Sequence, residues 1–405
     1  MAPPHGPRTG RCKVYGVVVI FSAKKIVKIL AEAIPSGSPL HEPEIAGNER
    51  VYVEECLKSG WVSPVGAFVD RFEGVLADYT GAGYAVACVN GTAALHTCLL
   101  MAGVASGDEV IIPTLTFVAT ANAVAYCGAV PHFADSEEAT LGLDPAKLEK
   151  YLERTAHITQ GKCFNRRTGK RIAAVVCMHT FGHPVDIDPL IKVCRHFKLP
   201  LIEDAAESLG SFYKDRHTGR DGLLSALSFN GNKIITTGGG GAVLTNDKEL
   251  AKAARHLTTT AKLPHRWEFI HDRVGFNYRM PNINAAIGCA QMEQLPGFID
   301  RKRRLARRYG EAFAGIAGVR FFHEPQNCRS NYWLNALILE KEHAGLRDSI
   351  LEAANDAGVM TRPTWRPMHH LEMYKNCPSM NLDVAEDLYA RIINIPSSPN
   401  LENDS

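Results

Sequence analysis

The chain has 405 residues, 45% of them hydrophobic and 22% charged, which excludes a disordered or fibrous protein. Its 45 Lys and Arg nearly balance its 43 Asp and Glu, so the net charge of +2 gives no global field to attract nucleic acid or an anionic membrane. No stretch reaches the roughly 18 consecutive apolar residues of a membrane span. The length favours two domains.

The N-terminal segment, residues 1–36, is expected to be an extension that is partly disordered. Its apolar run Val17–Phe21 is too short for a secretory signal, and Lys24 and Lys25 follow where a cleavage site would be expected. The 11 cysteines are odd in number and form no Cys-x-x-Cys pair, so we interpret them as reduced thiols. Both features favour a cytoplasmic protein.

Short β-branched runs alternate with helical segments through residues 37–296, which predicts a large α/β domain with a mainly parallel sheet. The expected strands cover 86–89, 109–112, 130–134, 173–178, 200–203, 226–229 and 242–245. The expected helices cover 92–102, 119–126 and 189–197. The polar, basic segment 160–171 contains two glycines and predicts a protruding hairpin or loop.

A second pattern begins near residue 284 and predicts a smaller C-terminal α/β domain over 297–405, appended by a long helix. The helix is expected over 284–309. Beyond it we expect strands over 319–322 and 333–339 and helices over 346–357 and 384–392.

Lys233 is followed by the four consecutive glycines 238–241. In a Walker-type phosphate loop the glycines precede the lysine and a helix follows, whereas here the lysine comes first and a strand follows. A lysine just after a buried strand, among small residues, better suits a Schiff-base lysine with a desolvated amine. The alternative is an exposed loop lysine without a chemical role.

An apolar strand over 200–203 ends in the acidic pair Glu203 and Asp204. The carboxyl end of a strand in an α/β sheet is where ligands bind. If the cofactor is pyridoxal phosphate (PLP), an ionised Asp204 would keep the pyridine nitrogen protonated, and the ring could then accept electrons. An acidic pair in this place is equally typical of helix capping.

Two more segments suit a flat, phosphorylated ligand. Asn90, Gly91 and Thr92 lead from a strand into a helix, where free N–H groups beside a hydroxyl can bind phosphate. Phe117 lies between a strand and a helix and could stack on a flat ring. Taken singly, the first segment is also typical of a simple helix cap and the second of a core phenylalanine.

These motifs, taken in order, resemble the PLP-dependent nucleotide-sugar aminotransferases of the DegT/StrS group over about residues 37–400. The resemblance rests on Asn90-Gly-Thr, Phe117, EDAAES at 203–208, SFNGNK at 228–233 and GFNYRMPN at 275–282. It implies a fold-type I aminotransferase, in which a mainly parallel seven-stranded sheet flanked by helices is joined to a smaller C-terminal α/β domain. It also implies a homodimer with shared active sites.

The resemblance assigns the central chemistry to Lys233 and Asp204. Lys233 would carry PLP as a Schiff base and move protons, Asp204 would pair with the pyridinium, and Phe117 would stack on the ring. The dehydratase relatives carry His in place of the lysine, so Lys233 favours transamination.

The same resemblance predicts how the cofactor's oxygens are held. Gly91, Thr92 and Ser228 would bind the phosphate, joined by Asn277 from the other subunit. Glu207 stands where many relatives have Gln or His beside the phenolic oxygen, and two acceptors facing each other there would require a shared proton.

Within the group, several motifs are most similar to the branch that aminates the 4-keto carbon of UDP-linked N-acetylated 6-deoxy sugars, as in legionaminic-acid and bacillosamine pathways. They are PLHEP at 39–43, HRW at 265–267, NYWLN at 331–335, MTRP at 360–363 and NIPSS at 394–398. Glutamate is the expected amino donor. A diphosphate favours cations and a sugar or base face accepts an aromatic, so the expected substrate residues are His265, Arg266, Trp267 and Arg362.

Two other enzyme functions and one of another class remain open. The substrate could be a GDP-linked 4-keto sugar, of the perosamine type, or a 3-keto sugar. The chain could instead be a non-catalytic, PLP-binding regulatory protein, although the presence of Lys233 and Asp204 weighs against this.

Neither a metal site nor nucleic-acid binding is expected. His179 and His183 are four residues apart but lack the glutamate of a zinc protease motif, and Gly182 lies between them. His369 and His370 are more typical of a surface or structural pair. The basic run 301–308 lies in a predicted helix without aromatic residues, so a solvated face is expected.

Overall fold

The structure is a computed structural model that describes residues 10–14 and 17–402. The N-terminal extension contains an antiparallel strand pair, β1 (Gly10–Val14) and β2 (Val17–Phe21), followed by helix α1 (Ala23–Ala33). Part of the predicted disorder falls on residues 1–9, outside the described residues. Within the described part of the chain, no helix has the length and apolar character needed to cross a bilayer. The ten cysteines with described side chains are free thiols.

The central sheet confirms the predicted mainly parallel path of seven strands, in which only β13 reverses direction among the described strands. The path, in spatial order, is β3 (Tyr84–Cys88), β13 (Gly241–Thr245), β12 (Leu224–Ser228), β9 (Leu201–Asp204), β8 (Arg171–Met178), β4 (Glu109–Pro113) and β5 (Val130–Ala134). The predicted protrusion is a hairpin of β6 (Ala156–Thr159) and β7 (Lys162–Asn165), which pairs with β8.

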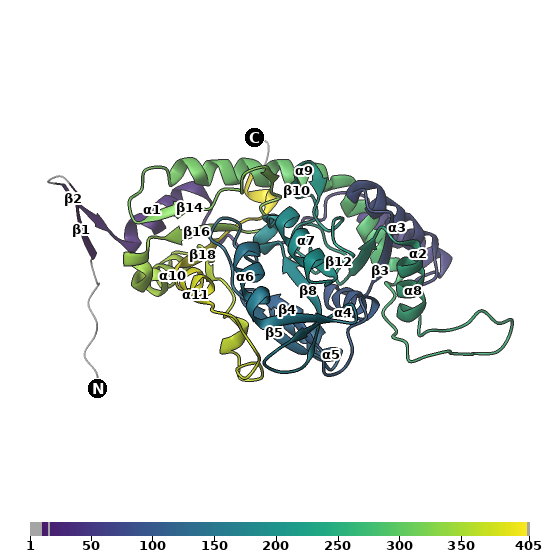
Figure 1. Cartoon of the computed structure of the whole chain (residues 1–405). Helices are drawn as coiled ribbons and strands as arrows, with labels where there is room; N and C mark the ends of the chain where they lie inside the picture. The colour runs from purple at the N-terminus through teal and green to yellow at the C-terminus, as the bar shows by residue number, and fades with distance from the viewer. Residues whose placement is uncertain (1–9, 15–16, 403–405) are drawn as a thin grey trace, which may run out of the picture.

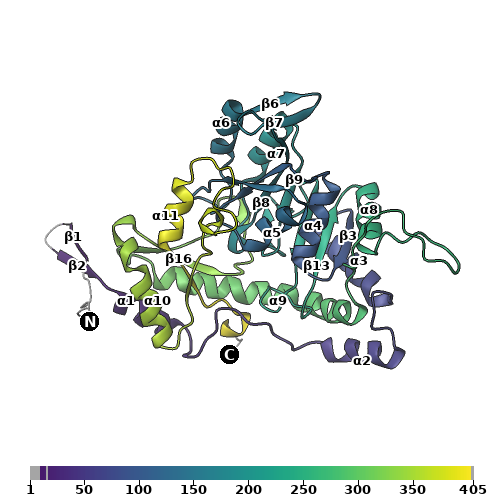
Figure 2. The ribbon, with the colours of Figure 1, turned by 90° about the horizontal axis from the view of Figure 1, so that it is seen from below.

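Helices cover both faces of this sheet because its strands are apolar on both sides. Val86 and Cys88 of β3 pack with helices on one face, and Ala85 and Ala87 pack with helices on the other, as the two-residue period of a strand requires. The first face carries α4 (Gly91–Met101), α5 (Val118–Tyr126) and α8 (Lys248–Thr258). The second carries α3 (Ala67–Thr80), α6 (Pro145–Thr155), α7 (Ile187–His196) and the long α9 (Asn282–Ala312). Figures 1 and 2 show these layers.

The C-terminal region forms a second, smaller sheet at one end of α9. Its order is β14 (Val319–Phe321), β16 (Asn335–Leu339), β18 (Ile392–Ile395) and β17 (Arg362–Pro363), with α10 (Arg347–Asp356) and α11 (Asp383–Arg391) beside it. The remaining elements are α2 (Glu49–Ser59), β10 (Phe212–Tyr213), β11 (Arg216–His217), β15 (Cys328–Arg329) and the short 3-10 turns at 180–182, 341–346, 368–370 and 399–402.

The division into residues 37–296 and 297–405 stays a prediction, and two packing features bear on it. α9 continues through Pro296, and its Leu295 and Phe298 pack with the central sheet while Leu305 and Tyr309 pack with the small sheet. α1 buries Ile26 and Leu30 in that second cluster, so part of the N-terminal extension belongs to the core of the small sheet.

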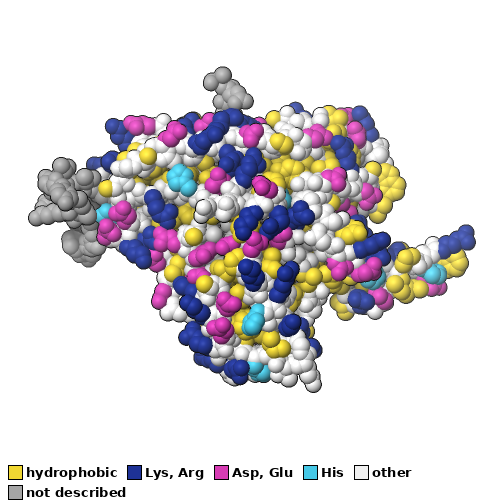
Figure 3. Space-filling view, turned by 45° about the horizontal axis from the view of Figure 1, so that its top comes forward, with side chains coloured by type: hydrophobic (Ala, Val, Ile, Leu, Met, Phe, Trp, Pro, Cys, Tyr) yellow, Lys and Arg dark blue, Asp and Glu magenta, His cyan; other side chains and the backbone are white. Residues whose placement is uncertain are grey.

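Residues 259–281, which connect α8 to α9, form an extended arm. The arm projects away from the rest of the molecule in both ribbon views (Figures 1 and 2). On the face in Figure 3, positive and negative side chains are interspersed, in keeping with the small net charge.

Candidate active site

A cavity of about 580 Å³ opens where the carboxyl ends of the central strands meet the small sheet. Asp204 ends β9, Ser228 ends β12 and Gly91 begins the helix that follows β3, so the parallel register brings three distant segments to one edge. The volume lies within the range of about 300–1,000 Å³ typical of ligand sites. The predicted residues that line it are Gly91, Thr92, Phe117, Asp204, Glu207, Ser228, Lys233 and Arg362.

Lys233 reaches this cavity from the turn after β12, with its side chain 11% exposed. Its Nζ donates a hydrogen bond to Glu207 Oε1 at 3.3 Å and lies 4.1 Å from the centroid of the Trp333 ring. Ile234 and Ile235, which follow it, are buried and fix the turn. The amine therefore faces the cavity, and contacts on two sides limit where it can point.

Asp204 is 5% exposed, and its carboxylate has few partners for its depth. Oδ2 accepts a hydrogen bond from Thr120 Oγ1 at 2.7 Å, and Oδ1 accepts one from the backbone N–H of Ala206 at 3.3 Å. Burial raises the pKa of Asp204, while the bond from Thr120 and the charge of Lys233 oppose the shift. A cationic N–H donor in the cavity would supply the missing counter-charge, which is what a pyridinium offers.

Glu207 is held by the loop after β8. Its Oε2 accepts a hydrogen bond from the Phe181 N–H at 2.9 Å, and Phe181 adopts a left-handed φ of 57° to present that N–H. Burial raises the pKa of Glu207 to about 7, although the charge of Lys233 opposes the shift. Near neutral pH the carboxyl is therefore about half protonated, and its protonated form can donate to a second acceptor such as a phenolic oxygen.

The start of α4 forms a phosphate-sized cradle. The Asn90 side chain caps the helix by accepting from the Ala93 N–H at 2.8 Å, which leaves the first-turn N–H groups of Gly91 and Thr92 at the cavity. A Cβ at Gly91 would lie 2.8 Å from Ser228 Cβ, so only glycine permits the approach of these two segments. Together with Asp204 and Glu207, this cradle fits the phosphate, ring nitrogen and phenolic oxygen of PLP.

Glu203, the other acid of the predicted pair, points away from the cavity and has a structural role. It accepts hydrogen bonds from His179 Nε2 at 2.9 Å and from the N–H groups of Gly219 and Gly222 at 2.8 and 2.6 Å. Burial opposes its ionisation, but these bonds hold the pKa of Glu203 below its ordinary value. The network fixes the end of β9 and with it the position of Asp204.

Four of the predicted site residues do not line the cavity of this chain. His265, Arg266 and Trp267 lie on the arm, where Trp267 is 70% exposed. Asn277 lies on the returning part of the arm, in an isolated bridge with Thr259, and is also exposed. Within one chain, only Arg362 of the four expected substrate residues lines the site.

Several lining residues were not singled out from the sequence. Trp333 sits under Lys233, and its Nε1 donates to the Asn232 carbonyl at 2.7 Å. Asn331 fixes it by accepting from the Trp333 N–H at 2.8 Å and donating to the Glu207 carbonyl at 2.9 Å. The motif NYWLN contained both residues, but nothing in its spacing indicates contact with Lys233.

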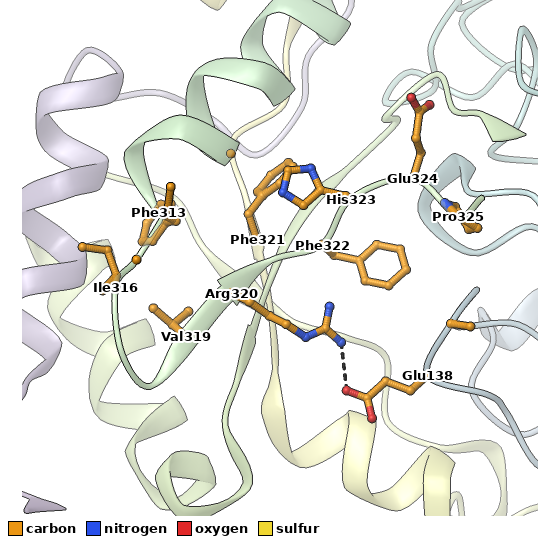
Figure 4. A pocket seen from close by; sticks show the side chains of 14 residues that line it. Glu138, Phe313, Ile316, Val319, Arg320, Phe321, Phe322, His323, Glu324 and Pro325 are labelled. Carbon is orange, nitrogen blue, oxygen red and sulfur yellow. Dashed lines mark hydrogen bonds and ion pairs between the residues drawn. The ribbon is translucent and has the colours of Figure 1, made fainter. Parts of the chain in front are cut away.

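Two other features lie outside this cavity. A hollow at the C-terminal end of α9 is walled by Phe313 and Phe321 and bounded by the ion pair between Arg320 and Glu138, whose Nη2 and Oε1 are 2.8 Å apart (Figure 4). None of the predicted site residues lines it. His369 and His370 each place Nε2 2.6 Å from the same oxygen of Glu386. The absence of a metal site remains a prediction.

Comparisons with known proteins agree with this geometry. The model of the DegT/DnrJ/EryC1/StrS aminotransferase family matches residues 43–405. GDP-perosamine synthase of Escherichia coli O157:H7 is 38% identical over 366 residues, covering 90% of this chain and 94% of that protein. GDP-perosamine synthase of Caulobacter vibrioides is 39% identical over 360 residues, covering 89% and 92%.

A solved structure extends the likeness to the fold. Helicobacter pylori PseC, an aminotransferase involved in the biosynthesis of pseudoaminic acid, superposes with a TM-score of 0.81 at 26% identity, covering 90% of this chain and 94% of that one. The fold-type I class and the PLP cofactor predicted from the motifs are thereby confirmed. The chain belongs to the DegT/DnrJ/EryC1/StrS aminotransferase family and is a PLP-dependent sugar aminotransferase.

Proposed function

We propose that this enzyme transfers an amino group from glutamate to the 4-keto carbon of a nucleotide-linked 6-deoxy-4-keto hexose. The observation that carries the proposal is the Lys233 amine, held between Glu207 and the Trp333 ring in a cavity that also contains the phosphate cradle and Asp204. Arg362 and Trp365 also line the cavity, on the side of the small sheet.

Each side chain has a distinct task in this reaction. When bound, PLP supplies a ring that accepts electrons from the reacting carbon. Lys233 moves a proton at that carbon, since its Nζ faces the cavity beside Glu207. Asp204 would balance the positive ring nitrogen, and Glu207 in its protonated form would donate to the phenolic oxygen. Phe117 lines the cavity and would stack on the face of the ring.

Two candidate substrates differ in the nucleotide that carries the sugar. The motifs at 39–43, 265–267 and 331–335 favour a UDP-linked 2-acetamido-6-deoxy-4-keto hexose, as in bacillosamine and legionaminic-acid synthesis. The names of the Escherichia coli and Caulobacter relatives favour a GDP-linked sugar of the perosamine type instead. Arg362 lines the cavity and suits the diphosphate that both share.

We also propose a homodimer in which the arm of one subunit reaches the site of the other. On the arm, the exposed fractions of Trp267 and Phe269 are 70% and 78%, which is unusual for large apolar residues. A partner would cover them and could bring Asn277, His265 and Arg266 to a second cavity.

A two-step spectroscopic assay tests the proposal. The purified enzyme is loaded with PLP, its visible absorption band is lost by adding glutamate, the donor is removed, and UDP- and GDP-linked 4-keto and 3-keto sugars are offered singly. Recovery of the band with a 4-keto sugar supports the proposal and identifies the nucleotide. Recovery only with a 3-keto sugar, or with none, contradicts it, and a band that never responds to glutamate supports a non-catalytic role.

A further inference from the structure

One wall of the cavity comes from the N-terminal segment and the small sheet. Residues 40–42 run beside the chain that follows β18, because the Ser397 N–H donates to the Leu40 carbonyl at 2.8 Å and the Glu42 N–H to Ser398 Oγ at 2.9 Å. This pairing holds the segment of His41 beside the chain that follows β18, and His41 and Asn394 of β18 both line the cavity.

The polar atoms of this wall lack partners. Both ring nitrogens of His41 and Oδ1 of Asn394 are buried and form no hydrogen bond of normal geometry within the described residues, although the backbone of Asn232 lies near the His41 ring. Buried polar atoms without a partner are uncommon and costly in folded proteins. The residues of the phosphate cradle, by contrast, come from the central sheet and its helices. The unpaired atoms therefore come from other segments than the phosphate cradle, although His41 lies near Asn232 and Lys233.

The charge state of this wall restricts the ligand. Burial, together with the nearby amines of Lys302 and Lys233, lowers the pKa of His41 well below its ordinary value, so its ring is neutral at pH 7. A neutral imidazole offers one donor and one acceptor, and Asn394 Oδ1 offers an acceptor. A group that both donates and accepts, such as a hydroxyl or a secondary amide, satisfies this set, whereas a phosphate cannot donate.

We propose that His41 and Asn394 form a subsite that binds the hydroxyl or amide groups of the sugar ring, and not the nucleotide. The inference rests on the proposed function and names the part of the substrate that this wall recognises. His41 and Asn394 are specificity-determining residues, since neither side chain contacts Lys233 through a hydrogen bond.

The test is equilibrium binding to the full-length PLP enzyme, measured by calorimetry with the amino-sugar nucleotide product and, separately, with UDP and GDP. His41→Phe and Asn394→Leu keep the side-chain volume and remove the polar atoms. Each is expected to weaken binding of the sugar nucleotide about tenfold, while binding of the free nucleotide is unchanged.

His183→Phe is the matched control, because both ring nitrogens of His183 are also buried and unpaired but the residue does not line the cavity. Both His→Phe variants should melt at or above the temperature of the unaltered enzyme, since each removes an unpaired buried polar group, and only His41→Phe should lose affinity. A structural role alone would not weaken binding while keeping stability.

The outcomes separate this inference from the proposed function. If the unaltered enzyme binds no sugar nucleotide, the proposed function fails and the ligand class fails with it. If it binds one and the His41 and Asn394 variants bind it equally well, the unpaired atoms are hydrated by water and this inference alone is overturned. An equal loss for the free nucleotides would also overturn it, because the wall would then hold the nucleotide.

Discussion

The Nζ of Lys233 lies 4.1 Å from the ring centroid of Trp333, whose Nε1 in turn donates to the carbonyl of Asn232, the residue before the lysine. One indole thus contacts the amine through its face and the backbone of the preceding residue through its edge. The backbone of Trp333 is fixed in turn by the buried Lys302, whose Nζ donates to the Trp333 carbonyl at 3.2 Å. Trp333 therefore positions the reactive amine.

Trp333→Leu is expected to lower kcat about tenfold, because a cation–π contact contributes roughly 0.5–2 kcal/mol and its loss frees the amine. Trp333→Phe keeps an aromatic face and loses only the bond to Asn232, so its kcat should lie between those of Trp333→Leu and the unaltered enzyme. Single-turnover rates with glutamate measure this, with PLP occupancy checked by absorbance. Equal losses in the two variants would show that the ring face contributes nothing.

Gly91→Ala is expected to weaken PLP binding at least tenfold. The new Cβ would lie 2.8 Å from Ser228 Cβ, closer than real Cβ atoms approach, so the cradle must open. Fluorescence titration of the apoenzyme with PLP measures the change.

Gly74→Ala is the matched control for this substitution. A Cβ there meets nothing within 4 Å, and the residue lies inside α3. It should leave PLP affinity unchanged and raise stability by about 0.5–1 kcal/mol through helix propensity. Unchanged PLP affinity in Gly91→Ala would remove this glycine from the phosphate site.

Glu207 gives a pH dependence whose sign follows from its burial. Because burial raises its pKa from 4.5 to about 7, the folded apoenzyme keeps a proton that the unfolded chain releases between pH 4.5 and 7. The free energy of unfolding therefore decreases as the pH rises through this window, by at most about 3 kcal/mol from this group.

Glu207→Gln removes that titration, so the variant should lose less stability than the unaltered apoenzyme between these pH values. Urea unfolding at a series of pH values measures the difference, which should grow up to about pH 7 and then stay constant. Parallel curves for the two proteins would mean that Glu207 ionises normally in the fold.

Much of the fold follows from local patterns. The seven strands and the long helix are strongly apolar or periodic, and each was expected within a few residues of its observed bounds. The helices α1, α2, α3, α6 and α8 were not expected. α3 buries Phe72 and Leu76, but these apolar residues alone do not distinguish a helix from a strand or a loop. The helix becomes evident only from its packing on α9.

The site residues likewise fall into those that local patterns predict and those that depend on long-range contacts. Residues at strand ends and helix starts, such as Asp204 and Gly91, are marked by their position relative to an element and were predicted. Trp333 and His41 reach the cavity through contacts between segments distant in the chain, which no spacing encodes. Asp204 is also bound by Thr120, one turn into a helix, for the same reason.

The arm offers the test of assembly. A double variant, Trp267→Ser with Phe269→Ser, removes the two most exposed aromatic side chains of the arm and should shift the enzyme from dimer toward monomer. Light scattering over a range of concentrations measures the mass. PLP affinity should fall with dissociation, since the expected contribution of Asn277 to the phosphate comes from the partner. Met373→Ser is the control, because Met373 is 62% exposed but lies off the arm. A double variant that remains dimeric would place the interface elsewhere, and an unaltered enzyme that is monomeric at all concentrations would mean that each site is complete within one chain.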